Sequence, residues 1–280
     1  LEYDYRARPY ALIPALAADM PSVAGDGRVL VFRIRPQARF APDACFGVDG
    51  QGVPRSRQVT AGDVVFSLKR LADAKLASPG YWLLDGRIAG LERFREHSLK
   101  TTPTDYDFPV EGLRALDEHT LRIELTAACP QFPWMLAMPY SAVVAPEAVA
   151  AYGERFGEHP VGSGAYRLET WRRNYSMSFV RHPGWHGWHS MAVSAERPPV
   201  GLPFDRLVFP VIDDPSTQWL AFLSGELDFQ GQIARDIWDS VVSAEGLLRP
   251  ELAARGIRLH AMPTLEVAYI GLNMDDPLLG

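Results

Sequence analysis

The chain has 280 residues and a formal net charge of -6, from 28 Lys and Arg against 34 Asp and Glu. Hydrophobic residues make up 47% and charged residues 22%, which is typical of a folded globular protein and excludes a mainly disordered or fibrous one. Because the charge is acidic and no dense Lys/Arg block occurs, we expect no nucleic-acid surface and no direct binding to an anionic membrane.

The first half of the chain predicts short strands and one capped helix. Apolar and polar residues alternate over 29–35, which indicates a half-buried strand. Thr60 precedes a run of apolar residues with helical spacing, and Asp63 is placed to complete a capping box, so we expect a helix over 61–72. Three further elements are expected in chain order: a hairpin within 110–125 and short helices near 131–137 and 146–152.

The second half begins at the best candidate for a linker, where two glycines in 162–164 relax the backbone. Asp214 and Pro215 are typical of a helix start, and Gly225 is placed to end that helix. The expected elements are strands at 165–171, 176–181 and 207–212, helices at 216–223 and near 233–242, and strands at 257–262 and 266–273. Because strands and helices are mixed throughout, the fold class is α/β or mixed α+β.

One histidine cluster has a spacing at which imidazoles can share a metal ion: His182, His186 and His189. A proline and two glycines lie between these residues, so no regular helix fixes the rings, and no nearby acidic residue is placed to orient them. We therefore expect a solvated, aromatic-anchored loop and no metal site.

No pattern in the chain is typical of catalysis or of a nucleotide cofactor. Ser163 lies between glycines, but it leads into a strand, whereas a nucleophile elbow leads into a helix. The pairs Asp213-Asp214 and Asp275-Asp276 are explained by helix capping and turns. Cys45 and Cys129 form no metal or redox motif, and a disulfide, an inert pair or two free thiols all stay open.

Aromatic residues give a different signal, because they commonly line ligand clefts. Most of the seven tryptophans are expected in the core. Tyr81 and Trp82 are the exception, since they follow a Ser-Pro-Gly break and begin no amphipathic element. We predict that one of the two faces a ligand.

Six segments resemble, in the same order, the motifs of one protein family. Phe32–Phe40 reads FRIRPQARF and resembles FxLRxGxxF, and Val59–Leu71 reads VTAGDVVFSLKRL and resembles LTAEDVVFSLKRL. The others are Leu116–Leu121, His159–Tyr166, Asp214–Thr217 with Phe222–Asp228, and Ile270–Met274. On these residues the chain resembles the family 5 extracellular solute-binding proteins, which serve ABC importers of oligopeptides, dipeptides and nickel complexes.

Two departures from the family pattern stand out. A longer loop, 41–58, replaces a short His-Asp-Gly turn, and His182 stands where the family pattern has Asn. The second change is expected to affect only a surface corner.

The resemblance implies one lobe of a type II periplasmic-binding-protein-like fold with an inserted α+β domain, the second lobe being missing. Residues 1–160 would form the inserted domain, and 161–280 the central-sheet part of the first lobe. The ligand-binding residues that it implies are Tyr81, Trp82, Gln230, Gln232, Leu265 and Glu266.

The implied function is that of a solute-binding component of an ABC importer, without catalysis or cofactor. It would capture oligopeptides or similar small solutes for the permease subunits, in the periplasm or at the outer face of the cytoplasmic membrane. Membrane contact would come only through the transporter or a lipid anchor. The alternatives are a peptide-sensing receptor of the same fold and a hydrolase, for which the sequence offers neither a nucleophile–base pair nor a metal triad.

Overall fold

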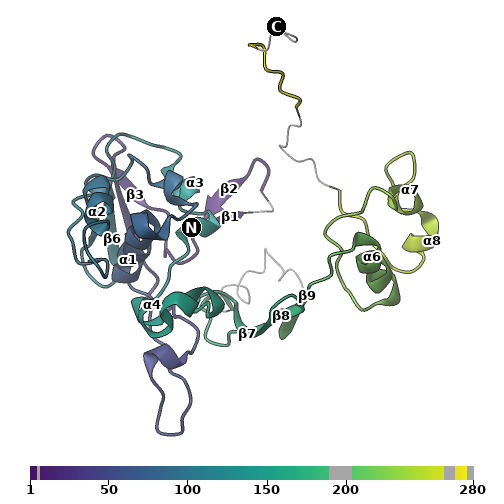
Figure 1. The fold of residues 1–280 in the computed structure, drawn as a ribbon, viewed down its shortest axis with the longest axis horizontal. Coiled ribbons are helices and arrows are strands. Elements are labelled where there is room, and N and C mark those ends of the chain that lie inside the picture. Colours follow the sequence, from purple (N-terminus) through teal and green to yellow (C-terminus); the bar gives the residue numbers. More distant parts are fainter. Residues whose placement is uncertain (5–6, 189–203, 262–268, 276–280) are drawn as a thin grey trace. The chain divides into compact units, whose positions relative to one another are not determined.

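A computed structural model of the chain describes residues 1–4, 7–188, 204–261 and 269–275. The chain divides into two compact units, Leu1–Pro210 (unit 1) and Val211–Gly280 (unit 2) (Figure 1). Within the described ranges, no helix is both long and apolar enough to cross a membrane.

Unit 1 is a mixture of short strands, α-helices and 3-10 helices (η). Its strands are β1 (Glu2–Asp4), β2 (Ala11–Ile13), β3 (Ser22–Ala24), β4 (Val29–Arg33), β5 (Leu113–Ala115), β6 (Thr120–Glu124), β7 (Tyr166–Arg172), β8 (Ser176–Arg181) and β9 (Arg206–Pro210). Its helices are η1 (Ala44–Phe46), α1 (Ala61–Ala72), η2 (Ala74–Leu76), η3 (Tyr81–Leu83), α2 (Leu91–Ser98), α3 (Phe132–Met135), η4 (Pro139–Ser141), α4 (Pro146–Tyr152) and η5 (Gly153–Glu158).

The core of unit 1 is built on an antiparallel sheet with the strand order β3-β4-β6-β5. The two central strands pair from Val29 opposite Glu124 to Arg33 opposite Thr120. Alternate residues of β4 face the core, so that Leu30 is buried and Arg33 is exposed. The strand expected at 29–35 and the hairpin expected within 110–125 are both confirmed.

Helix α1 covers residues 61–72, as its sequence predicts. The Thr60 side chain accepts from the Asp63 backbone, and the Asp63 carboxylate accepts from the Thr60 backbone at 2.7 Å, which completes the capping box. The helix also buries Lys69, whose ammonium donates to the carbonyls of Tyr106 and Phe108 at 2.8 and 2.9 Å. A buried charge is tolerated here because it is hydrogen-bonded.

A second antiparallel sheet, β7-β8-β9, confirms the strands expected near 165–171, 176–181 and 207–212. It belongs to unit 1, which ends at Pro210. The domain boundary inferred from the family resemblance, at residue 160, falls inside this unit and stays a prediction.

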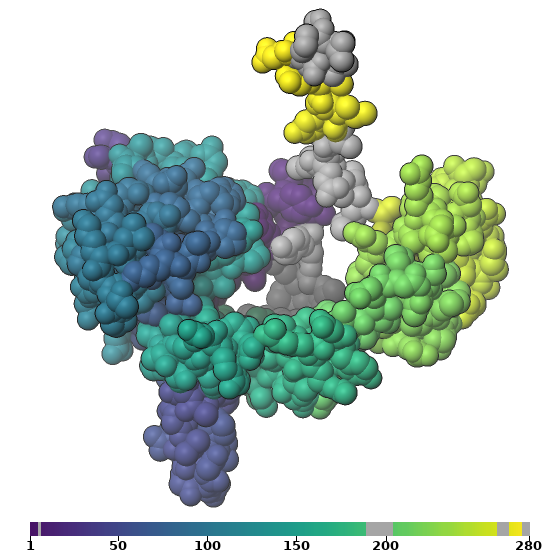
Figure 2. All heavy atoms as spheres, in the orientation of Figure 1, coloured from purple at the N-terminus to yellow at the C-terminus, as the bar shows by residue number. Residues whose placement is uncertain are grey.

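The loop between Pro42 and Arg57 protrudes from the surface of unit 1 (violet-blue in Figure 2). Within it, the Asp49 carboxylate accepts from the backbone of Gln51 and Val53, both at 2.9 Å, and closes a turn. Cys45 lies at the root of the loop, where burial and a hydrogen bond to Asp43 raise the pKa of its thiol to about 12. Cys45 and Cys129 are both free, which excludes the disulfide among the alternatives left open by the sequence.

The described part of unit 2 contains three helices, α6 (Pro215–Ser224), α7 (Trp238–Val241) and α8 (Pro250–Ala253). They pack around a small core of Trp219, Val241, Val242 and Leu252. Asp214 caps α6 as predicted, and Gly225 ends it in the left-handed region, at φ 82°.

Three expected elements of unit 2, one helix and two strands, differ from the structure. The helix expected near 233–242 is confirmed only as the shorter α7, whose N-cap Ile237 supplies no side-chain hydrogen bond and packs against the core. Residues 257–261 and 269–273, expected in strands, are in no strand; no described segment pairs with them, and Ile257 and Leu259 pack against the core of unit 2. The rest of those two strands lies outside the described residues.

Candidate functional site

A cavity of about 410 Å³ in unit 1 is the best candidate for a binding site. Most of its walls are apolar, and they come from several parts of unit 1: Leu1, the β2–β3 connection, β4 with Ile34 after it, α1, Leu121 of β6 and the segment 136–143. Glu2 is the one charged side chain among the described lining residues. An apolar cavity with few polar groups is the usual form of a small-molecule site.

Three consecutive residues add backbone amides to the lining of this cavity. Gly162, Ser163 and Gly164 all line it, and no described residue accepts a hydrogen bond from their N–H groups. Their carbonyls are partly engaged: that of Gly162 accepts from Ala41 N at 2.8 Å, and that of Gly164 lies 3.2 Å from the Nδ1 atom of His182. A row of free N–H groups suits a carbonyl or carboxylate oxygen. We call Gly162–Gly164 the amide row.

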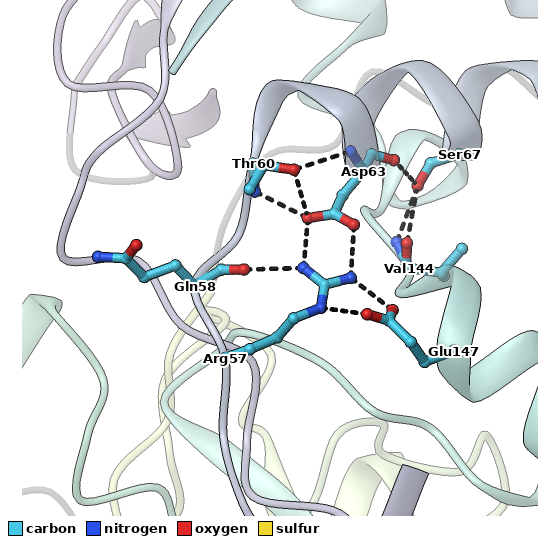
Figure 3. A network of polar contacts seen from close by, with 7 residues as sticks. All are labelled: Arg57, Gln58, Thr60, Asp63, Ser67, Val144 and Glu147. Carbon is cyan, nitrogen blue, oxygen red and sulfur yellow. Dashed lines mark hydrogen bonds and ion pairs between the residues drawn. The ribbon is translucent and has the colours of Figure 1, made fainter. Parts of the chain in front are cut away.

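Arg57 joins α1, which contributes to the cavity wall, to α4 (Figure 3). Its guanidinium donates to both carboxylate oxygens of Asp63 at 2.8 and 2.7 Å, and to both of Glu147 at 2.6 Å. Although burial has the opposite effect, these hydrogen bonds raise the pKa of Arg57. The hydrogen bond from Arg57 lowers the pKa of Glu147, against the effect of burial. The start of α1 is thereby fastened to α4.

Ser67 extends this connection toward the cavity wall. Its Oγ atom accepts from Val144 N at 2.9 Å and donates to the Asp63 carbonyl at 2.6 Å (Figure 3). Val143, the residue before this contact, lines the cavity, as do Val64 and Leu68 of the same helix. The Arg57 and Ser67 contacts therefore hold two cavity walls against each other.

The structure places Tyr81 and Trp82 on η3 but not in the lining of this cavity. Tyr81 packs against the core, donates to the Glu92 carboxylate and lies under Arg95, with 4.0 Å from the guanidinium carbon to the ring centre. Burial, followed by the hydrogen bond to Glu92, raises its pKa. Trp82 is 50% exposed. Of the two, Trp82 has the surface that a ligand can reach.

Gln230 and Gln232 lie in unit 2, close to each other. The side-chain amide of Gln230 donates to the Gln232 carbonyl at 2.9 Å and to the Gln218 side chain at 3.3 Å. The Gln232 side chain is exposed. Leu265 and Glu266, the other two predicted ligand contacts, lie outside the described residues.

His182 does not lie at a surface corner, as the sequence suggested, but is 2% exposed. The His182 and His186 rings lie 3.2 and 3.3 Å from the carbonyls of Gly164 and Ala15, two residues that line the cavity. His189 lies outside the described residues, so the absence of a metal site at the three histidines stays a prediction.

Comparison with known proteins decides the family of this chain. The model of the family described as bacterial extracellular solute-binding proteins, family 5 middle, matches residues 11–280. The chain belongs to this family. The membership confirms the family resemblance read from the sequence motifs.

Two kinds of curated relatives illustrate the family. The periplasmic oligopeptide-binding protein OppA of Escherichia coli (strain K12) is 32% identical over 161 residues, which are 56% of this chain and 26% of OppA. The glutathione-binding protein GsiB of Escherichia coli O1:K1 / APEC is 28% identical over 161 residues, 57% of this chain and 27% of GsiB. The match thus spans about a quarter of the length of these relatives.

Solved structures show the same fold. The murein tripeptide-binding protein MppA, in an unliganded open form, matches with a TM-score of 0.63 and 24% identity over 84% of this chain and 40% of that one. The pheromone receptor PrgZ matches with a TM-score of 0.60 and 24% identity over 80% of this chain and 40% of that one. The predicted fold class, a mixed α/β lobe of the type II periplasmic-binding-protein kind, is confirmed.

Sequence reasoning missed the cavity itself. It interpreted Gly162–Gly164 as a linker, although the same residues belong to a motif shared with the family. The signal that could have pointed to the cavity is a serine between two glycines that leads into a strand and not into a helix. The remaining walls come from distant segments and gave no local signal.

Proposed function

We propose that the protein of which this chain is part binds oligopeptides or similar small solutes outside the cytoplasm and delivers them to an ABC permease, without catalysis. The observation that carries the proposal is the amide row on the wall of an apolar cavity. A peptide offers both complementary parts, carbonyl or carboxylate oxygens for the N–H groups and side chains for the walls. The curated relatives, named for binding an oligopeptide and glutathione, support a peptide ligand.

The cavity walls further favour peptides with aliphatic or aromatic side chains. Burying such a side chain contributes roughly 1.5–3 kcal/mol, whereas a buried charge without a partner is unfavourable. Glu2 is the single carboxylate at the wall, and it is suited to a peptide amine. Burial raises the pKa of Glu2, while the adjacent N-terminal ammonium and, after it, Arg35 oppose this rise.

We also propose that Trp82, Gln230, Gln232, Leu265 and Glu266 contact the ligand, with Tyr81 behind Trp82 as a packing residue. A binding protein of this family works outside the cytoplasmic membrane, and we propose the periplasm or the membrane's outer face for this one.

A cavity-filling substitution tests the proposed site. An added Cβ at Gly162 meets no atom within 4 Å, so the backbone accepts a side chain here, and Gly162→Leu adds an apolar group at the cavity wall. We expect trileucine binding, measured by calorimetry or by NMR shifts at millimolar peptide, to weaken at least tenfold, or about 1.4 kcal/mol.

Gly157→Leu is the matched control, because its added Cβ also meets nothing within 4 Å and Gly157 does not line the cavity. This variant should bind trileucine as the unchanged chain does. Equal binding by both variants contradicts the proposed site, and a failure of the unchanged chain to prefer trileucine to triglycine contradicts the proposed ligand class.

Comparing Trp82→Ala with Tyr81→Ala distinguishes a ligand contact from a packing residue. Since Trp82 is half exposed and Tyr81 is packed, we expect Trp82→Ala to weaken trileucine binding by about 1–3 kcal/mol with little loss of stability. Tyr81→Ala should lower the melting temperature instead. Unchanged affinity in Trp82→Ala, measured by the same titration, removes this residue from the site.

A further inference from the structure

A second cavity, of about 350 Å³, lies in unit 1. Its described walls come from the root of the protruding loop, from η5 with the two residues after it, and from the edge strand β7 with the residue after it. Six of its nine described lining residues have ionisable side chains: Asp43, Arg155, Glu158, His159, Glu169 and Arg173. None of the nine lines the apolar cavity, so the two cavities are separate.

The charges at this polar cavity are paired with one another. Glu158 accepts from Arg173 and lies 3.5 Å from Arg155 Nε, so that one carboxylate lies between two guanidinium groups. Glu169 is paired with Arg206 of β9. With the carboxylate at the loop root, three carboxylates balance three arginines. A ligand that carries a charge has to displace one member of these pairs.

His159 is a neutral ring in a fixed orientation. Its Nε2 atom lies 3.1 Å from Arg155 Nη2, and because a guanidinium only donates, Nε2 is the acceptor and the ring proton is on Nδ1. The ring stacks on Tyr152, with 4.1 Å between the ring centres and 8° between the planes. Tyr152 in turn donates through its hydroxyl to Asp43 at 2.6 Å. No described residue accepts a hydrogen bond from the Nδ1–H group of His159.

The ion pairs at the wall present donors and acceptors side by side. Arg155 and Arg173 are 71% and 69% exposed, and each uses only part of its five N–H groups. A hydroxyl group both donates and accepts. Two neighbouring hydroxyls can therefore bridge such a pair, because one accepts from the guanidinium while the other donates to the carboxylate. A polyol satisfies these groups without displacing either partner, whereas an ion replaces one of them.

Trp171 of β7 adds an apolar surface beside these polar groups. It lines the cavity and is 41% exposed, and the guanidinium carbon of Arg173 lies 5.5 Å from its ring centre. The C–H face of a sugar ring packs well on an aromatic ring, through dispersion and because the face of the aromatic ring is negative. An aromatic ring next to paired planar charges thus matches both the apolar face and the hydroxyls of a sugar.

We propose that this polar cavity binds a neutral sugar of one or two rings, with Trp171 against the sugar ring and the Arg173–Glu158–Arg155 group on its hydroxyls. His159 donates through Nδ1 to a further hydroxyl. The volume is at the lower end of the range of roughly 300–1,000 Å³ for small-molecule sites, which suits a ligand of this size. The site goes beyond the proposed peptide function and does not depend on it.

NMR titration of the isotope-labelled chain tests the site. The probes are glucose, galactose, mannose and N-acetylglucosamine, each added up to tens of millimolar. We expect at least one of them to shift the indole N–H of Trp171 and the ring resonances of His159, while the amides of Gly162–Gly164 stay in place. The proposal is overturned if none of the four sugars shifts the Trp171 indole.

Inorganic phosphate and leucine test the ligand class. Phosphate is an anion and leucine is a zwitterion, so each has to displace a member of an ion pair at the wall. We expect neither to shift the Trp171 indole at concentrations at which a sugar does. A stronger response to phosphate or leucine than to the sugars overturns the assignment to a neutral ligand.

Trp171→Ala should weaken binding of the responding sugar at least tenfold, measured on the His159 ring resonances. Trp171→Phe should weaken it less, because the aromatic face is kept. Trp238→Ala is the matched control, since Trp238 is similarly exposed, at 47%, and lies in unit 2 outside the lining of this cavity. This control should bind the sugar as the unchanged chain does.

Arg155→Met removes hydrogen-bond donors without changing strand β7, and it should also weaken sugar binding at least tenfold. Arg93→Met is its control, because Arg93 belongs to an exposed ion pair with Glu111 and does not line the cavity. Far-UV circular dichroism checks that each variant is folded. Unchanged affinity in a folded Trp171→Ala or in Arg155→Met overturns the proposal, and Arg155→Met decides alone if Trp171→Ala does not fold.

Discussion

Replacing Arg57 by methionine is expected to lower the free energy of unfolding of unit 1 by about 3 kcal/mol. The substitution leaves the Asp63 carboxylate, whose side chain is 4% exposed, without its bidentate partner. Removing one member of a buried ion pair costs about 3–5 kcal/mol, and we use the lower end because Arg57 and Glu147 are 28% and 43% exposed. Urea unfolding followed by far-UV circular dichroism measures the change.

Arg33→Met is the matched control for this prediction. Arg33 also pairs with an aspartate, Asp19, at 2.5 Å, but the two side chains are 72% and 60% exposed. An exposed pair contributes roughly 0–1 kcal/mol, so this variant should unfold close to the unchanged chain. Similar losses in both variants would show that burial of Asp63 does not determine the effect.

Gly112→Ala is expected to destabilise unit 1 by about 3 kcal/mol or more, because the added methyl group has no room. Its Cβ would lie 2.4 Å from Glu124 O and 2.8 Å from both Ala89 N and Ala89 O, all of them backbone atoms. Relief requires separation of three backbone segments, which are joined by hydrogen bonds from Gly112 N to Ala89 O at 2.8 Å and from Glu124 N to Gly112 O at 2.7 Å. Each hydrogen bond contributes roughly 0.5–1.5 kcal/mol.

The melting temperature of the Gly112→Ala variant gives the measurement. Gly157→Ala is its control, since the Cβ added at Gly157 meets no atom within 4 Å. A fall in melting temperature confined to Gly112→Ala supports the clash. Equal melting temperatures contradict it.

The sequence predicted correctly those helices whose ends are fixed by residues within or next to the helix itself. Thr60 and Asp63 specify the start of α1, and Asp214 with Gly225 specifies both ends of α6. The helix expected near 233–242 is shorter than predicted, because apolar residues such as Ile233 and Ile237 pack against the small core of unit 2 without being helical. Apolar spacing alone does not distinguish these two outcomes, whereas a capping side chain does.

The candidate site was harder to predict, because its parts come together only in the folded chain. Gly162–Gly164 are about 20 residues before His182 in the sequence, and nothing local shows that an imidazole reaches the Gly164 carbonyl. The contact between Ser67 and Val144 joins residues 77 positions apart. Trp82 could be singled out because an aromatic residue after a Ser-Pro-Gly turn is a local feature of the sequence. Whether this half-exposed side chain meets a ligand depends on the arrangement of distant segments, which the sequence did not predict.

The pairing of β4 with β6 has a consequence for the time at which this protein can fold. The two central strands of the sheet pair residues 29–33 with residues 120–124, so this pair cannot form until the chain has been synthesised beyond residue 124. Contacts between such distant residues form slowly, because a long loop must close first. During synthesis, residues 29–33 therefore lack their β6 partner until residues 120–124 are available, and chaperones have time to capture this segment before its core closes.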